Sequence, residues 1–120
     1  MTIPVEIVLK GRDFAVNESV VVPGGDAPAW SDALVHDLLV AILRAIGRAD
    51  DPKSAADRPV ALQGFSWIVE PVNGQVVIAI EIPMGAAVAG PFDADQAELD
   101  ALVGRVIRAD RQRRSPDTVH

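Results

Sequence analysis

The chain has 120 residues, with 17 acidic and 11 basic side chains, and it contains no cysteine. Its net charge of −6 argues against a general nucleic-acid binder. The lack of cysteine excludes disulfides, thiolate metal sites and cysteine nucleophiles. Hydrophobic residues make up 49% of the chain, which is more apolar side chain than one core of this size hides. We therefore expect part of it to be hidden between subunits.

The length predicts a single domain, which we place at residues 1–112, followed by a flexible tail at 113–120. The opening stretch has no basic segment ahead of an apolar one, so it does not read as a signal peptide. The longest apolar runs are too short to span a bilayer. These features predict a cytoplasmic protein that does not enter a membrane.

The first 26 residues predict two strands. Residues 3–9 alternate between apolar and other side chains, as a strand does. Lys10 to Asp13 interrupts this pattern, and residues 14–16 resume it. Asn17-Glu18 then predicts a turn before a second strand at 19–22, which ends at Pro23-Gly24-Gly25.

Two helices are predicted from apolar residues at helical spacing. The first runs over 29–48 with Asp26 or Ser31 as its N-cap, and a polar loop with two prolines follows at 49–59. The second runs over about 94–112. Asp93 with Gln96 three residues later resembles a capping box at its start.

The clearest local signal is Asn73-Gly74 between two apolar runs, because a two-residue hairpin turn needs residues that accept a positive φ. Counting outward from the turn pairs Glu70 with Val77 and Ile68 with Ala79. Side chains alternate across a strand, so the hairpin has two faces. The apolar face, which we expect in the core, carries Phe65, Trp67, Val69, Ile78, Ile80 and Ile82. The mixed face carries Ser66, Ile68, Glu70, Val77, Ala79 and Glu81.

The predicted fold is α+β, in the order ββαββα: a four-stranded antiparallel sheet with two helices packed on one face. Residues 84–92 are interpreted as a connection rich in small residues. Short matches around Asn17 and Asn73, and around residues 48–50 and 108–110, raise the alternative of a duplicated ββα unit at 3–50 and 59–110.

Few residues stand out as candidates for chemistry. His36 has Asp32 four residues before it, the spacing at which a carboxylate can orient an imidazole, although a surface histidine is the more ordinary interpretation. Glu70 and Glu81 share a sheet face, where paired carboxylates do acid–base work only if partly buried. No set of side chains predicts a metal or cofactor site. The arginine-rich end from Arg105 to Arg114 is a weak candidate for contact with RNA.

The leading hypothesis is a non-enzymatic interaction or accessory protein, acidic and homodimeric, that binds another protein. Its interface is predicted on the mixed face of the hairpin, at Ser66, Ile68, Glu70, Val77, Ala79 and Glu81. The alternative is a small-molecule-binding protein or an enzyme, with a site between the sheet and the 84–92 connection. Its candidate residues are Asp32, His36, Glu70 and Glu81.

Overall fold

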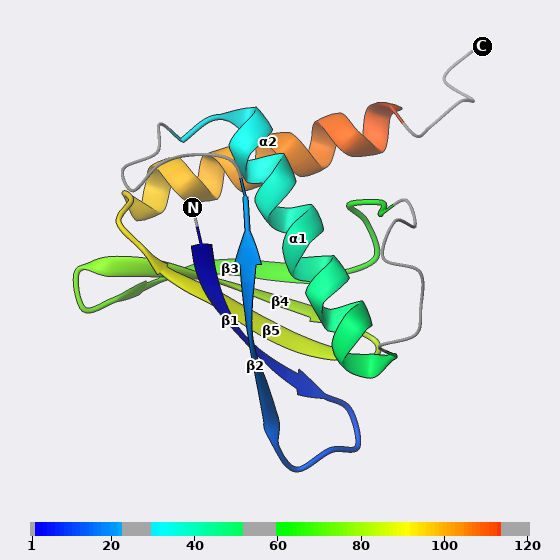
Figure 1. Ribbon diagram of the computed structural model, residues 1–120. Coiled ribbons are helices and arrows are strands. Elements are labelled where there is room, and N and C mark those ends of the chain that lie inside the picture. Colours follow the sequence, from blue (N-terminus) through cyan, green and yellow to red (C-terminus); the bar gives the residue numbers. More distant parts are fainter. Residues whose placement is uncertain (1, 23–29, 52–59, 114–120) are drawn as a thin grey trace.

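The computed structural model describes residues 2–22, 30–51 and 60–113 and has two helices over one face of a five-stranded antiparallel sheet (Figure 1). The elements in chain order are β1 (Thr2–Leu9), β2 (Ala15–Val21), α1 (Asp32–Asp50), β3 (Ser66–Val72), β4 (Gln75–Ile82), β5 (Gly85–Phe92) and α2 (Gln96–Arg113). The α+β class is confirmed. The predicted four strands and the order ββαββα are wrong, because the order is β-β-α-β-β-β-α.

The additional strand is β5, which occupies the stretch interpreted as a connection. It lies at the centre of the sheet, whose strand order is β2-β1-β5-β4-β3. Alanine and glycine have low strand propensity, so the sequence of β5 does not resemble a strand. Its neighbours explain why small residues are needed: a Cβ at Gly85 would lie 2.5 Å from the carbonyl oxygen of Val8 in β1.

The β3–β4 hairpin has the predicted register. Ile68 lies opposite Ala79 and Glu70 opposite Val77. Asn73 and Gly74 form the turn with φ angles of 50° and 84°, as a two-residue turn of this kind requires. The predicted faces are also confirmed, since Val69, Ile78 and Ile80 are buried while Ile68 is 50% exposed.

The first hairpin differs from its prediction. The turn expected at Asn17-Glu18 is wrong: Asn17 lies inside β2, opposite Glu6 of β1. The chain reverses earlier, where Gly11 has a φ of 84°. The stretch around Asn17 is therefore extended while the matching stretch around Asn73 forms a turn, and a duplicated unit stays a prediction.

Both helices begin later than predicted. Ser31 is the N-cap of α1, and its side chain accepts a hydrogen bond from the backbone N–H of Leu34. At α2 the predicted capping box is wrong. The side chain of Asp95 accepts from the backbone N–H of Glu98, while Gln96 donates to the carbonyl oxygen of Val69 in β3. The predicted loop at 49–59 lies outside the described residues from 52 on, and the predicted tail does so from 114 on.

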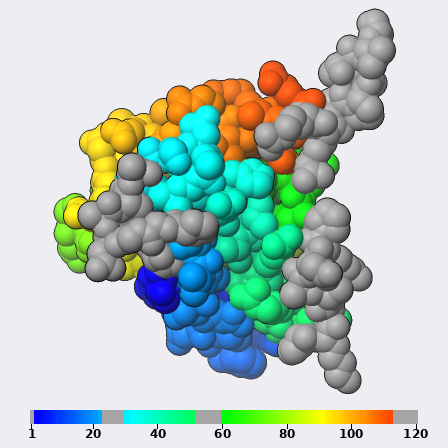
Figure 2. Space-filling view, turned by 45° about the horizontal axis from the view of Figure 1, so that its top comes forward, coloured from blue at the N-terminus to red at the C-terminus, as the bar shows by residue number. Residues whose placement is uncertain are grey.

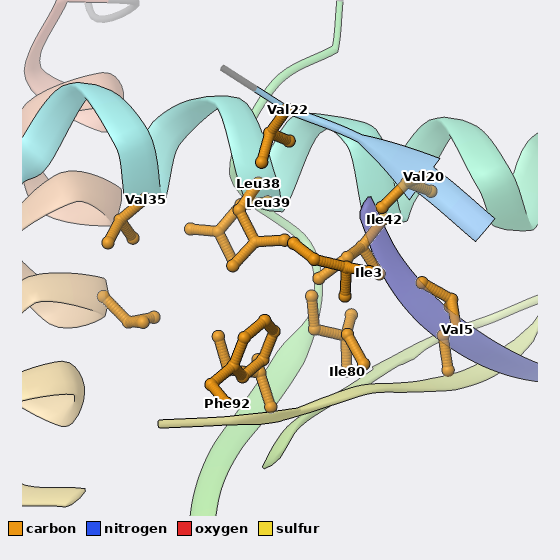
Figure 3. Packing of buried hydrophobic residues seen from close by; sticks show 14 of the residues in the cluster. Ile3, Val5, Val20, Val22, Val35, Leu38, Leu39, Ile42, Ile80 and Phe92 are labelled. Atoms are coloured by element: carbon orange, nitrogen blue, oxygen red, sulfur yellow. The ribbon is translucent and has the colours of Figure 1, made fainter. Parts of the chain in front are cut away.

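The core lies between the helices and the sheet. Val35, Leu38, Leu39 and Ile42 of α1 point toward side chains from the strands (Figure 3). Figure 2 shows α1 and α2 side by side over this side of the molecule. The sheet residues beneath them are buried at alternate positions, including Ile3, Val5, Ile7, Leu9, Ile78, Ile80, Ala87 and Ala89. The opposite side of the sheet carries no helix from the described part of the chain.

Candidate functional site

We call the side of the sheet that faces away from the helices the open face. It contains the residues that alternate with the buried ones in each strand. Three of the large apolar side chains exposed on it are Val88 on the central strand β5 (40%), Val8 on β1 (47%) and Ile68 on the edge strand β3 (50%). Large apolar patches that are exposed on a soluble protein usually mark a site of interaction. All six residues of the predicted interface lie on this face: Ser66, Ile68, Glu70, Val77, Ala79 and Glu81.

Register places these side chains in rows across the strands. In one row Glu6 lies beside Val88, Val88 beside Ala79, and Ala79 beside Ile68. In the next row Val8 lies beside Ala86, which lies beside Glu81. The apolar side chains are therefore adjacent to one another, and carboxylates stand at the sides of the group.

The charges of the open face have one sign. None of the five described strands contains a lysine or an arginine. Three glutamates, Glu6, Glu70 and Glu81, are exposed on this face. The fourth strand glutamate, Glu18, lies opposite buried Val5 on the helix side, and its carboxylate bonds Arg48 of α1 at 3.1 Å.

A shallow hollow of about 290 Å³ lies on the open face over β3, β4 and β5. Its floor is made by Ala79 and Ala86, because alanine leaves the backbone uncovered between the larger Ile68 and Val88. A wider hollow of about 770 Å³ lies at the ends of the strands and includes Lys10, Phe65 and the β4–β5 turn. Both hollows are lined by Ser66, Glu81 and Ala86, so they are continuous.

The four candidates of the enzyme alternative do not come together. Asp32 and His36 line a hollow of about 320 Å³ between α1 and α2. Glu70 and Glu81 lie on the open face, on the far side of the sheet. They are one strand and four residue positions apart, which is about 14 Å, so they do not form a carboxylate pair. The predicted site was to lie between the sheet and a connection at 84–92. That connection is wrong, because 85–92 is a strand of the sheet itself.

The structure does join His36 to a residue that the sequence did not single out. Its Nε2 lies 3.9 Å from Oδ1 of Asp110, a carboxylate only 2% exposed. The other oxygen of Asp110 accepts a hydrogen bond of 2.9 Å from the backbone N–H of Leu62. The sequence does contain a signal that Asp110 is buried, because it continues the apolar stripe of α2 one turn beyond Val106.

Asp32 has a structural partner on the other helix. The guanidinium of Arg105 donates from Nε to Oδ2 at 3.0 Å and from Nη2 to Oδ1 at 2.5 Å. This hydrogen bond, more than the attraction of the charge, holds the pKa of the Asp32 carboxyl below its ordinary value and raises the pKa of Arg105. The pair connects α1 to α2, and Arg105 is thereby engaged within the protein.

Comparison with protein-family models, with curated proteins and with solved structures found no match for this chain. Within the part of the chain that the structure describes, no three histidine, aspartate or glutamate side chains gather closely enough to hold a metal ion. No helix among the described residues is long and apolar enough to cross a membrane.

The open face also contains residues that the predicted interface lacked. Ala86 and Val88 were missed because β5 was not recognised as a strand, although they stand between β1 and the hairpin. Glu6 and Val8 of β1 also lie on this face, beside Val88 and Ala86, and the predicted interface did not include them. The central strand joins the two hairpins into one continuous surface.

Proposed function

We propose that this protein is a non-enzymatic interaction protein that binds a partner protein on the open face of its sheet. The observation that supports this most is the exposure of Val8, Ile68 and Val88 on one face that no helix among the described residues covers. Transfer of such side chains out of water is the main source of affinity in most protein interfaces.

Charge favours a partner other than a second copy on this face. Two open faces in contact would bring Glu6, Glu70 and Glu81 of each copy together, with no lysine or arginine from the described strands between them. Like charges placed together in an interface oppose binding by several kcal/mol. A partner with basic groups at the rim of its contact would meet complementary charge instead.

The predicted homodimer is better placed at the edge of the sheet. β2 is an outermost strand of the described sheet, and an edge strand offers backbone groups for pairing with another strand. Joining two copies antiparallel through β2 would continue the sheet and leave the open face available. Sedimentation at micromolar concentration tests this: we expect a dimer that Val21→Lys disrupts, and a strict monomer would contradict it.

Selection from a displayed library of random peptides tests the proposed function. We expect the selected peptides to bind the natural chain and to lose binding to Ile68→Lys, which places a charge on the open face beside the hollow of about 290 Å³. Phe14→Lys is the matched control, because Phe14 is 60% exposed just before β2, outside the three strands β3, β4 and β5 that carry the hollow. Peptides that bind Ile68→Lys as well as the natural chain, or a selection without enrichment, would contradict the proposal.

The small-molecule alternative has one observation in its favour. The hollow of about 770 Å³ at the strand ends lies in the size range of ligand pockets, and Lys10, Ser66 and Glu81 are among its polar lining residues. A thermal-shift screen with small charged metabolites tests it. We expect a metabolite that binds in the hollow to raise the melting temperature of the natural chain. The same metabolite should not change the melting temperature of Ser66→Trp, because the tryptophan obstructs the hollow.

A further inference from the structure

The open face has features that define the kind of partner it accepts. We infer that the partner segment is a basic amphipathic helix, whose apolar stripe lies over Ala79 and Ala86 and whose lysines or arginines pair with Glu6 and Glu81. This inference rests on the proposed function and deepens it. It is argued from the width of the apolar strip, from the shape of its floor and from the charges beside it.

The width of the apolar strip matches one helix. Ile68 and Val88 form its two sides and are separated by β4, so they are two strands apart. Adjacent strands are about 4.8 Å apart, which makes the strip about 10 Å wide. A helix with its side chains is about 10–12 Å across. One helix therefore covers the strip, and its flanks reach the residues outside it.

The floor of the strip lets a helix approach closely. Ala79 and Ala86 are the small residues between Ile68, Val88 and Val8, and the hollow of about 290 Å³ lies over them. A leucine or methionine from the partner fills this hollow and contacts the larger side chains around it. Filling such a depression with an apolar side chain is how a helix is anchored in a groove.

The charges beside the strip specify the flanks of the helix. Glu6 lies next to Val88 on one side, and Glu81 lies next to Ala86 and Ser66 at one end. The described strands contain no lysine or arginine, and Lys10, just after β1, is the basic residue that lines the wider hollow together with Glu81. A helix with a lysine or arginine beside its apolar stripe brings a cation to Glu6, and one with a basic residue at the end of the stripe brings a cation to Glu81; these pairs set its orientation and its rate of association.

The probe is a synthetic helix of leucine and lysine with all leucines on one face, and its affinity is measured by isothermal titration calorimetry. We expect Ala79→Leu, which fills the hollow, to weaken binding at least about tenfold. Ala15→Leu is the matched control: it adds the same side chain to the same face at an exposed position on β2, opposite Val8 and outside the hollow. We expect it to leave the affinity unchanged. Circular dichroism confirms that each variant is folded.

A second arm tests the charges without changing the packing. Glu81→Lys is expected to weaken binding of the leucine–lysine helix by a similar factor and to reduce its dependence on salt, with Glu81→Gln intermediate. A helix in which glutamate replaces every lysine should bind poorly to the natural chain and better to Glu81→Lys. Equal binding of both helices to the natural chain would overturn the assignment of a basic partner.

The outcomes separate this inference from the function on which it rests. If library peptides bind the open face but Ala79→Leu and Glu81→Lys leave the affinity of the leucine–lysine helix unchanged, the inference fails and the proposed function stands. If the selected peptides bind Ile68→Lys as well as they bind the natural chain, the inference and the proposed function both fail. NMR chemical shifts can also be followed while the leucine–lysine helix is added. Shifts of resonances from α1 and α2, in place of those from β4 and β5, would overturn the inference.

Discussion

The carboxylate of Asp110 near the end of α2 accepts a hydrogen bond of 2.9 Å from the backbone N–H of Leu62. Asp110 and Leu62 are 2% and 0% exposed, so this bond is buried. It fixes the chain that enters β3 against the last turns of α2. Because Oδ1 of the same carboxylate lies 3.9 Å from His36 of α1, three segments meet at one side chain.

Removing this acceptor should destabilise the fold. We expect Asp110→Ala to lower the free energy of unfolding by about 1–3 kcal/mol, because the buried N–H of Leu62 would lose its partner. Asp110→Asn keeps an acceptor oxygen and should lower the free energy of unfolding by less. Chemical denaturation measures both. Asp100→Ala, at an exposed position of the same helix, is the control and should stay within about 0.5 kcal/mol of the natural chain. An equal loss for Asp100→Ala and Asp110→Ala would contradict the structural role.

The pair formed by Asp32 and Arg105 should depend on pH. The hydrogen bond from Arg105 lowers the pKa of Asp32 below 3.8, so the folded state favours the ionised carboxylate. The stabilisation is therefore present above about pH 3.8 and is lost as pH falls through the lowered pKa. In an NMR titration of the side-chain carboxyl carbon, Asp32 should titrate at a higher pH in Arg105→Gln than in the natural chain. Arg108→Gln should leave the titration unchanged, and an unchanged midpoint in Arg105→Gln would show that the pair does not persist in solution.

Two glycine-to-alanine changes should have opposite effects on the free energy of unfolding. At Gly85 the new Cβ would meet the carbonyl oxygen of Val8 at 2.5 Å, so β5 and β1 must move apart. We expect a loss of about 1–3 kcal/mol in the free energy of unfolding. At Gly47 in α1 a Cβ meets nothing within 4 Å, and alanine is the better helix former, so a gain of about 0.5–1 kcal/mol is expected. Thermal unfolding of both variants checks the pair. A neutral Gly85→Ala would mean that the strands accommodate the methyl group.

The parts of the fold that the sequence predicted are those set by local chemistry. The register of β3 and β4 follows from Asn73-Gly74, because few residue pairs accept two positive φ angles. That register alone placed Ser66, Ile68 and Glu81 on the face for which we propose binding. The same reasoning found α1 and α2 from the spacing of their apolar residues.

The parts that were missed depend on contacts between distant segments. β5 has no alternation of large side chains, and its extended conformation comes from pairing with β1 and β4. The turn expected at Asn17 shows the opposite error: a turn-forming residue lies within a strand because β1 pairs with it on one side. The predicted interface consequently lacked Ala86 and Val88, which lie on the same open face between β1 and β4.

The distribution of charge over the two layers has a consequence for how the molecule approaches a basic partner of the kind we propose. Glu6, Glu70 and Glu81 give the strands three negative charges on the open face, while Glu18 faces the helices; α1 has a net charge of −1 and α2 of +1, so the two helices together are neutral. Among these elements, negative charge is therefore concentrated on the side of the sheet that faces away from the helices. Such a molecule rotates as it approaches a positively charged surface and arrives with its sheet foremost. Added salt should slow this oriented approach more than it speeds dissociation.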